Sequence, residues 1–208
     1  MKSSRQFAAA TFLFVLFIAS TAWTQTIARS DIVKALQSGG YVIVMRHASS
    51  PREPPDASIA NPDNVDRERQ LDETGRREAQ AMGQALRRLK IPVTEVLSSP
   101  TYRAVETAKL MGFTNITRVE ELGNEGMRAS RDTYIAWLRG NMATPPQSGN
   151  RLLITHGPNV AGAFPENAAG MEEGEALIFH AEGKGDAEVV GRLKITDWAG
   201  LSTGTPQD

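Results

Sequence analysis

Short runs of apolar residues recur along the chain, and several have the pattern of buried strands. The runs "YVIVM" (41–45) and "RLLIT" (151–155) are nearly continuous, and "VTEVL" (93–97) lies between them. Apolar runs of this length are typical of strands that are covered on both faces of a sheet. The segments "EALIFHA" (175–181) and "AEVVGRLKI" (187–195) flank a glycine-rich turn and predict a closing pair of strands. A further short strand is predicted in "ITRVEE" (116–121).

Helical spacing of apolar residues separates these strands. In "LDETGRREAQAMGQALRRLK" (71–90), Ala79, Met82 and Leu86 recur at intervals of three and four, and Asp72 or Thr74 can cap the start. Other helices are predicted at 31–38 after Ser30, at 101–111 opened by Pro100, at 130–142, and within 156–164. In the helix at 130–142 we expect Trp137 and Met142 to belong to the core.

The alternation of strands and helices predicts an α/β fold. We expect three layers, with an open and mostly parallel sheet covered by helices on both faces. The polar segment 48–70 between the first strand and the next helix predicts a long loop. We divide the chain into a first helix within 23–40, one domain over 41–198 and a loose tail over 199–208.

The N-terminus has the layout of a secretory signal peptide. Lys2 and Arg5 precede a short apolar run, and small residues follow it up to Ala22. Residues 1–22 are therefore predicted to be removed on export to the periplasm or the medium, and an uncleaved anchor is the alternative. The apolar run is short for a membrane span, so no stable membrane association is expected after cleavage. The chain has no cysteine, which excludes disulfides, thiol chemistry and cysteine-ligated zinc.

Composition excludes few partners but gives no reason to expect nucleic acid. The formal net charge is −1 over 208 residues, with a pI near 6.3. We find no His-x-His pair, no His-Glu-x-x-His motif and no glycine-rich nucleotide loop, so neither a metal site nor a cofactor is predicted. Chemistry must therefore be sought in the placement of individual polar residues.

Three predicted strands end in polar residues of one chemical kind. Arg46 and His47 follow the first strand, Arg103 lies just beyond the second, and His156 follows "RLLIT". Ligands of open α/β sheets bind at the carboxyl ends of the strands, so these side chains are expected to meet at one edge. Taken alone, each histidine or arginine would be read as structural or solvated, and His180 is read in that way. Together they predict a cationic site for a phosphoryl group, because arginine binds phosphate oxygens and imidazole can attack phosphorus.

These segments resemble the motifs of the histidine phosphatase superfamily, which is also called phosphoglycerate mutase-like. The resemblance covers the chain from about Tyr41 to Trp198. Four motifs occur within it in the right order, namely "VMRHA", "LDETGRREAQAMGQAL", "SSPTYRAVETA" and "ITHGPN". The chain is most similar to the small, single-domain branch with exported members. The resemblance implies that His47 is the nucleophile that becomes phosphohistidine. It also implies that Arg46, Arg103 and His156 hold the phosphate.

A general acid is also implied by the resemblance. In "EELGNEGM", Glu125 keeps the family's Asn-Glu pair and is favoured over Glu121, with Glu120 nearby. The segment departs from the family pattern by the extra Gly123, and all three glutamates could be solvated turn residues. Ala48 stands where the family more often has glycine. Ser49 or Ser50 could contact phosphate, although forming the turn is the simpler interpretation.

The leading hypothesis is a metal-independent phosphomonoester hydrolase that acts on a small phosphorylated substrate through phosphohistidine on His47. A phosphoglycerate mutase or a phosphohistidine phosphatase of the same superfamily is the first alternative, and a non-catalytic protein that binds a phosphorylated ligand is the second. The mixed charges of the segment 48–70 favour no particular substrate.

Overall fold

The computed structural model describes residues 29–51, 68–123, 130–181 and 187–201. The helices are α1 (Arg29–Ser38), α2 (Glu73–Arg88), α3 (Tyr102–Leu110), the 3-10 helix η2 (Glu120–Leu122), α4 (Arg131–Ala143), α5 (Gly157–Ala163) and α6 (Asp197–Gly200). The strands are β1 (Tyr41–Arg46), β2 (Val93–Ser98), β3 (Thr117–Arg118), β4 (Asn150–Thr155), β5 (Ala176–Ala181) and β6 (Ala187–Leu193). The predicted signal peptide lies outside the described residues and stays a prediction. No helix of the described ranges is long and apolar enough to cross a membrane.

The strands form one six-stranded mixed sheet in the order β3-β2-β4-β1-β5-β6. The pairs β3–β2, β2–β4 and β4–β1 are parallel, whereas β5 runs antiparallel to both β1 and β6. The predicted α/β class and the closing pair of strands are therefore confirmed. The "ITRVEE" segment differs from its prediction, because only Thr117 and Arg118 pair with β2 before η2 begins.

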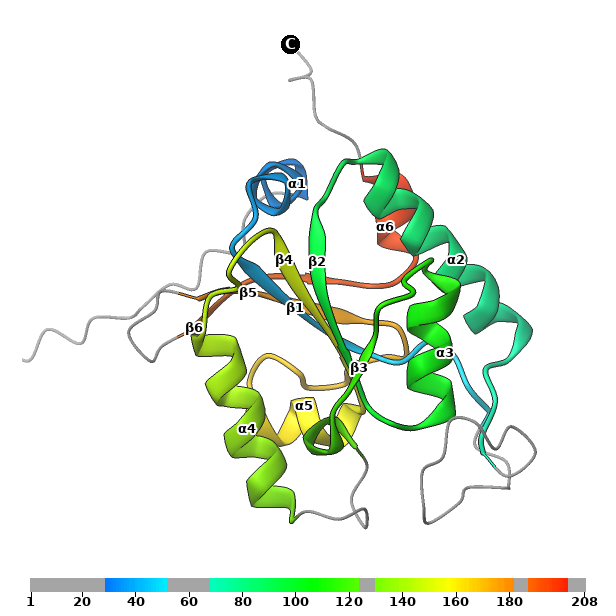
Figure 1. Ribbon diagram of the computed structural model, residues 1–208, viewed down its shortest axis with the longest axis vertical. Helices are drawn as coiled ribbons and strands as arrows, with labels where there is room; N and C mark the ends of the chain where they lie inside the picture. Colours follow the sequence, from blue (N-terminus) through cyan, green and yellow to red (C-terminus); the bar gives the residue numbers. More distant parts are fainter. Residues whose placement is uncertain (1–28, 52–67, 124–129, 182–186, 202–208) are drawn as a thin grey trace, which may run out of the picture.

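Helices cover both faces of the sheet (Figure 1). One face packs against α1, α2, α3 and α6 in an apolar cluster that includes Ile43, Met82 and Trp198. The other face packs against α4 and α5 around Leu138, Leu153 and Phe179. Met142 is fully buried in this second cluster, whereas Trp137 is only partly buried against it. The three-layer arrangement follows from strands that are apolar on both faces.

Two predicted helix starts are wrong by one or two residues. Helix α1 already begins at Arg29, before Ser30, and the Arg29 guanidinium forms an ion pair with Asp197 of α6 at 3.1 Å. Helix α3 begins at Tyr102 with Thr101 as N-cap, so Pro100 precedes the helix. The Tyr102 amide donates to the Glu68 carboxylate at 2.5 Å, and this contact caps the helix from a distant segment.

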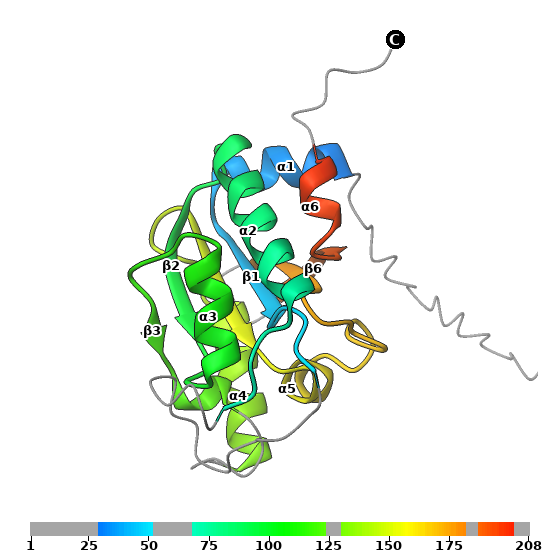
Figure 2. The same ribbon diagram turned by 90° about the vertical axis from the view of Figure 1, so that its right-hand side faces the viewer.

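Asp72 caps α2 as predicted, and it accepts a hydrogen bond from the Gly75 amide at 2.7 Å. Helices α2 and α3 lie side by side on the same face of the sheet (Figure 2). Their close approach depends on Gly83, because a Cβ atom there would lie 2.0 Å from the backbone oxygen of Met111. The α2–α3 contact matters for the site, since α3 carries Arg103.

We therefore predict that Gly83→Ala destabilises the protein by about 1–3 kcal/mol, because the added methyl group overlaps backbone that cannot move freely. Gly140 is the matched control, since it is also helical but has nothing within 4 Å of an added Cβ. Gly140→Ala should stabilise by about 0.5–1 kcal/mol through its higher helix propensity. Urea unfolding of both variants measures the difference, and equal effects would contradict the packing interpretation.

Candidate active site

The carboxyl ends of β2, β4 and β1 are aligned at one edge of the sheet. Arg46 pairs with Thr155 and Ser98 with Ile154, so all three strands end at nearly the same level. Two further backbone bonds extend this alignment past the strand ends, from the His47 amide to Thr155 O at 3.0 Å and from the Ser99 amide to Ile154 O at 2.8 Å. As a result, the residues that follow the three strands face one another.

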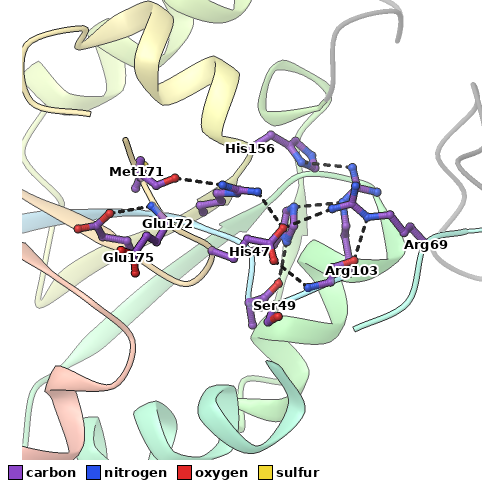
Figure 3. A network of polar contacts seen from close by, with 12 residues as sticks. His47, Ser49, Arg69, Arg103, His156, Met171, Glu172 and Glu175 are labelled. Atoms are coloured by element: carbon purple, nitrogen blue, oxygen red, sulfur yellow. Dashed lines mark hydrogen bonds and ion pairs between the residues drawn. The ribbon is translucent and has the colours of Figure 1, made fainter. Parts of the chain in front are cut away.

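The structure brings together the four residues that the sequence singled out. The rings of His47 and His156 lie edge to face with centroids 5.3 Å apart. The Arg103 side chain lies against both rings, with its Nε donating to His47 Nε2 at 3.2 Å and its NH2 at 3.4 Å from His156 Nδ1. Arg46 is the last residue of β1, directly before His47. Figure 3 shows the two histidines and Arg103 turned toward one another.

Hydrogen bonds define the tautomer of each histidine. His47 Nδ1 lies 2.8 Å from Ala48 O, and a carbonyl can only accept, so Nδ1 carries the proton. Nε2 of His47 therefore keeps its lone pair, which accepts from Arg103. By the same reasoning His156 Nδ1 accepts from Arg103, and its Nε2 donates to Ser99 Oγ at 2.9 Å. The nitrogen of His47 that faces Arg103 is thus the nucleophilic one.

Burial keeps both rings neutral. His47 and His156 are 2% and 3% exposed. Burial lowers the pKa of His47 well below its ordinary value of 6.5, and the nearby Arg103 lowers it further. Burial is also the largest cause that lowers the pKa of His156 well below 6.5, followed by His47 and Arg103. Arg69 and Arg46 act on both histidines in the same direction.

The turn that follows His47 is held by its neighbours. The Ala48 amide donates to Thr107 Oγ1 at 3.1 Å, and the same hydroxyl donates to Arg103 O at 2.7 Å. Ser49 Oγ donates to the Asp72 carboxylate at 2.7 Å, and Ser50 Oγ donates to Gln70 O at 2.6 Å. Both serine hydroxyls therefore serve the turn, which agrees with the simpler of the two interpretations.

Two residues near this edge were not among the predicted site residues. Arg69 belongs to the polar segment 48–70, whose charges favoured no particular substrate, yet its Nε donates to Ser50 Oγ at 2.9 Å in the turn after His47. Glu173 binds Arg46 at 2.8 Å from the segment before β5. Arg69 stands just before the α2 motif, which could have indicated it, but a glutamate in "MEEGEA" carries no such signal.

The predicted acid is not among the described residues. Glu125 lies outside them, and Glu121 belongs to η2. The described chain before Glu125 ends beside the site, because the Leu122 carbonyl accepts from Thr155 Oγ1 at 2.8 Å and the Gly123 carbonyl accepts from the Asn159 side chain at 2.6 Å. His180 lies on β5 against Tyr41 and is exposed, away from the paired histidines. The described residues contain no group of acidic and histidine side chains that could hold a metal ion.

The depressed histidine pKa values predict that acid destabilises the fold. Below pH 6.5 the unfolded chain binds protons at histidine, while buried His47 and His156 stay neutral until their lower folded-state pKa values are reached. Stability should therefore fall with decreasing pH across this window, by up to about 1.4 kcal/mol per pH unit for each histidine. Urea unfolding between pH 5 and 8 tests this for the wild type and a His47→Asn, His156→Asn double variant. Identical pH dependence in the two proteins would contradict it.

Comparison with known proteins identifies the family and the fold of the chain. Residues 42–153 match the model of the histidine phosphatase superfamily, branch 1. The fold is similar to that of the protein histidine phosphatase SixA in complex with tungstate, with 20% identity, a TM-score of 0.57, and coverage of 76% of this chain and 98% of SixA. SixA from Agrobacterium tumefaciens is also similar, with 17% identity, a TM-score of 0.53, and coverage of 74% and 97%.

No curated protein sequence matches the chain. The family model nevertheless spans more than half of its length and includes Arg46, His47 and Arg103. The chain therefore belongs to the histidine phosphatase superfamily, and it is a phosphatase.

Proposed function

We propose that the protein hydrolyses small phosphomonoesters in two steps through a phosphohistidine on His47. The observation that carries this proposal is the state of the His47 ring, which is neutral and oriented by Ala48 O so that Nε2 presents its lone pair to Arg103. An imidazole in this state is a competent nucleophile toward phosphorus. Because its pKa is depressed, it stays nucleophilic in mildly acidic solution as well as at neutral pH.

In the first step His47 Nε2 forms a bond to phosphorus while the bond from phosphorus to the ester oxygen breaks. Phosphate oxygens offer Arg103 an anionic acceptor in place of Nε2, and this exchange frees the lone pair for attack. The guanidiniums of Arg46 and Arg103 stabilise the charge on the equatorial oxygens. His156 can add a hydrogen bond there if its Nε2 proton exchanges Ser99 Oγ for a phosphate oxygen. Since fixed guanidiniums supply this positive charge, the proposed reaction uses no metal ion.

The leaving oxygen needs a proton, which we assign to Glu125. This assignment is supported by the anchoring of Leu122 and Gly123 to Thr155 and Asn159, next to His156. In the second step a water molecule gives a proton to the Glu125 carboxylate and attacks phosphorus, and the bond to Nε2 breaks to release phosphate. Nδ1 keeps its proton, hydrogen-bonded to Ala48 O, throughout, so Nε2 regains its lone pair.

His47→Ala should lower kcat/KM for p-nitrophenyl phosphate by at least about 1,000-fold, because the nucleophile is lost. His180→Ala, which removes an exposed histidine outside the site, should stay within about twofold of the wild type. A quenched reaction with radiolabelled substrate should give an acid-labile, base-stable phosphoenzyme in the wild type only. Assays with a chelator should give unchanged rates, and hydrolysis by His47→Ala at the wild-type rate would overturn the proposal.

The role of the acid depends on the leaving group. Glu125→Gln should lower kcat/KM for an alkyl phosphate by about 100-fold or more, yet change kcat/KM for p-nitrophenyl phosphate by less than about tenfold, because kcat/KM reports the first step and nitrophenolate leaves without a proton. Glu121→Gln is the matched control on the same segment and should behave like the wild type. The opposite pattern would transfer the role to Glu121.

The substrate panel for these assays should include a phosphohistidine peptide. SixA, whose fold is similar, is a protein histidine phosphatase. Preference for the peptide over small phosphoesters would replace the proposed substrate class while keeping the mechanism. The predicted export signal remains part of the proposal, and it favours a substrate found outside the cytoplasm.

A further inference from the structure

The segment 171–175, which precedes β5, contacts the residues at the carboxyl end of β1. Arg46 NH1 donates to Met171 O at 3.0 Å, and the Arg46 amide donates to Glu175 O at 3.0 Å. The Gly174 amide in turn donates to His47 O at 2.9 Å. This segment therefore holds both the main chain and the side chain of the Arg46-His47 pair.

Within this segment the Glu173 carboxylate joins three parts of the site. One oxygen, Oε1, lies 2.8 Å from Arg46 NH2 and 3.7 Å from Arg69 NH2. The other, Oε2, accepts from the Ser50 amide at 3.0 Å. The side chains of Glu173, Arg46 and Arg69 are 21%, 17% and 13% exposed, so the group is largely shielded from solvent. One side chain thus connects the end of β1, the turn after His47 and the segment that leads into α2.

The charges around the histidines explain why such a contact matters. Arg46, Arg69 and Arg103 all act on the pKa values of the two buried rings, so three guanidiniums gather around them. Like charges at short range repel one another, and long side chains relieve the repulsion by moving apart. A carboxylate shared by Arg46 and Arg69 opposes this movement and holds both guanidiniums close to the buried histidines.

The neighbouring glutamates have different roles. Glu175 is buried and forms a two-pronged contact with Arg192 at 2.6 and 2.8 Å, which ties the segment to β6. Glu172 pairs with Lys194 at 2.8 Å on the surface. Figure 3 shows Glu172 and Glu175 near Met171, on the opposite side of His47 from Arg69. Glu172 is therefore a matched control for Glu173, because it is adjacent, has the same chemistry and forms an exposed ion pair.

We propose that Glu173 is a positioning residue, which fixes the Arg46 and Arg69 guanidiniums for the charge that develops on the transferring phosphoryl group. This inference rests on the proposed function and adds a residue to it. Glu173 does not serve as a proton donor in this role, because its contacts are to guanidinium and amide donors. Interactions that are aligned for the transition state raise kcat, whereas general attraction for an anion does not.

The test compares Glu173→Gln and Glu173→Ala with Glu172→Gln. For p-nitrophenyl phosphate, we expect both Glu173 variants to lose about 10- to 100-fold in kcat with KM changed by less than about threefold. Vanadate, which adopts the five-coordinate geometry of the transition state, should bind more weakly by a similar factor, while inorganic phosphate should bind within about threefold of the wild type. Glu172→Gln should match the wild type in every assay.

Several outcomes would overturn the inference. These are wild-type kcat in the Glu173 variants, equal losses for vanadate and phosphate, or the same loss in Glu172→Gln. The melting temperature is measured in parallel, and Glu173→Gln, which keeps an oxygen for the Ser50 amide, covers the case in which Glu173→Ala does not fold. If the wild type shows no turnover, the proposed function fails, and the ratio of vanadate to phosphate affinity then decides the role of Glu173 independently.

Discussion

The parallel pairing of β4 with β2 and β1 is the constraint on which the site depends. Ser98, Thr155 and Arg46 end their strands at nearly the same level of the sheet. The chain therefore needs no long loop to bring the ring centroids of His47 and His156 to 5.3 Å from each other. Helices on both faces make the sheet edge rigid, and the backbone bonds from His47 and Ser99 extend that rigidity into the catalytic residues. The register of the strands thus determines where the site residues lie, and side-chain packing on both faces of the sheet maintains that register.

The electrostatics of the site balance two opposing effects. Arginines favour an anionic group such as phosphate, and by the same charge they suppress protonation of His47 and His156. Burial also lowers the pKa values of both rings. The cationic surroundings are therefore compatible with a neutral imidazole at His47. A carboxylate within the cluster then limits the repulsion among the guanidiniums. The result is a site that is positive toward a ligand and neutral at His47 Nε2, the proposed attacking atom.

The sequence predicted the parts of this arrangement that follow from local pattern. Continuous apolar runs located β1 and β4, and polar residues at their ends located Arg46, His47 and His156. It could not locate Glu173. That residue lies near Arg46 because β5 is antiparallel to β1, so the segment before β5 lies beside the carboxyl end of β1. In the sequence, a glutamate that faces an arginine looks the same as one that faces solvent. The start of α3 was misplaced for a similar reason, since the amide of its first residue, Tyr102, binds the Glu68 carboxylate, which lies 34 positions away in sequence.

The hydroxyl of Thr107 has a consequence for how this site responds to motion. It accepts from the Ala48 amide and donates to the Arg103 carbonyl, so the nucleophile's turn and the arginine that faces the nucleophile are fastened to one turn of α3. The His47 main chain is itself bonded to Thr155 of β4, so the Thr107 hydroxyl links α3 to the sheet edge at the point where Arg103 meets His47. A shift of α3 against the sheet would have to break the bond from the Ala48 amide. The distance between His47 and Arg103 therefore depends on how firmly α3 packs on the sheet, and mutations that alter this packing at a distance would act on the site through Thr107.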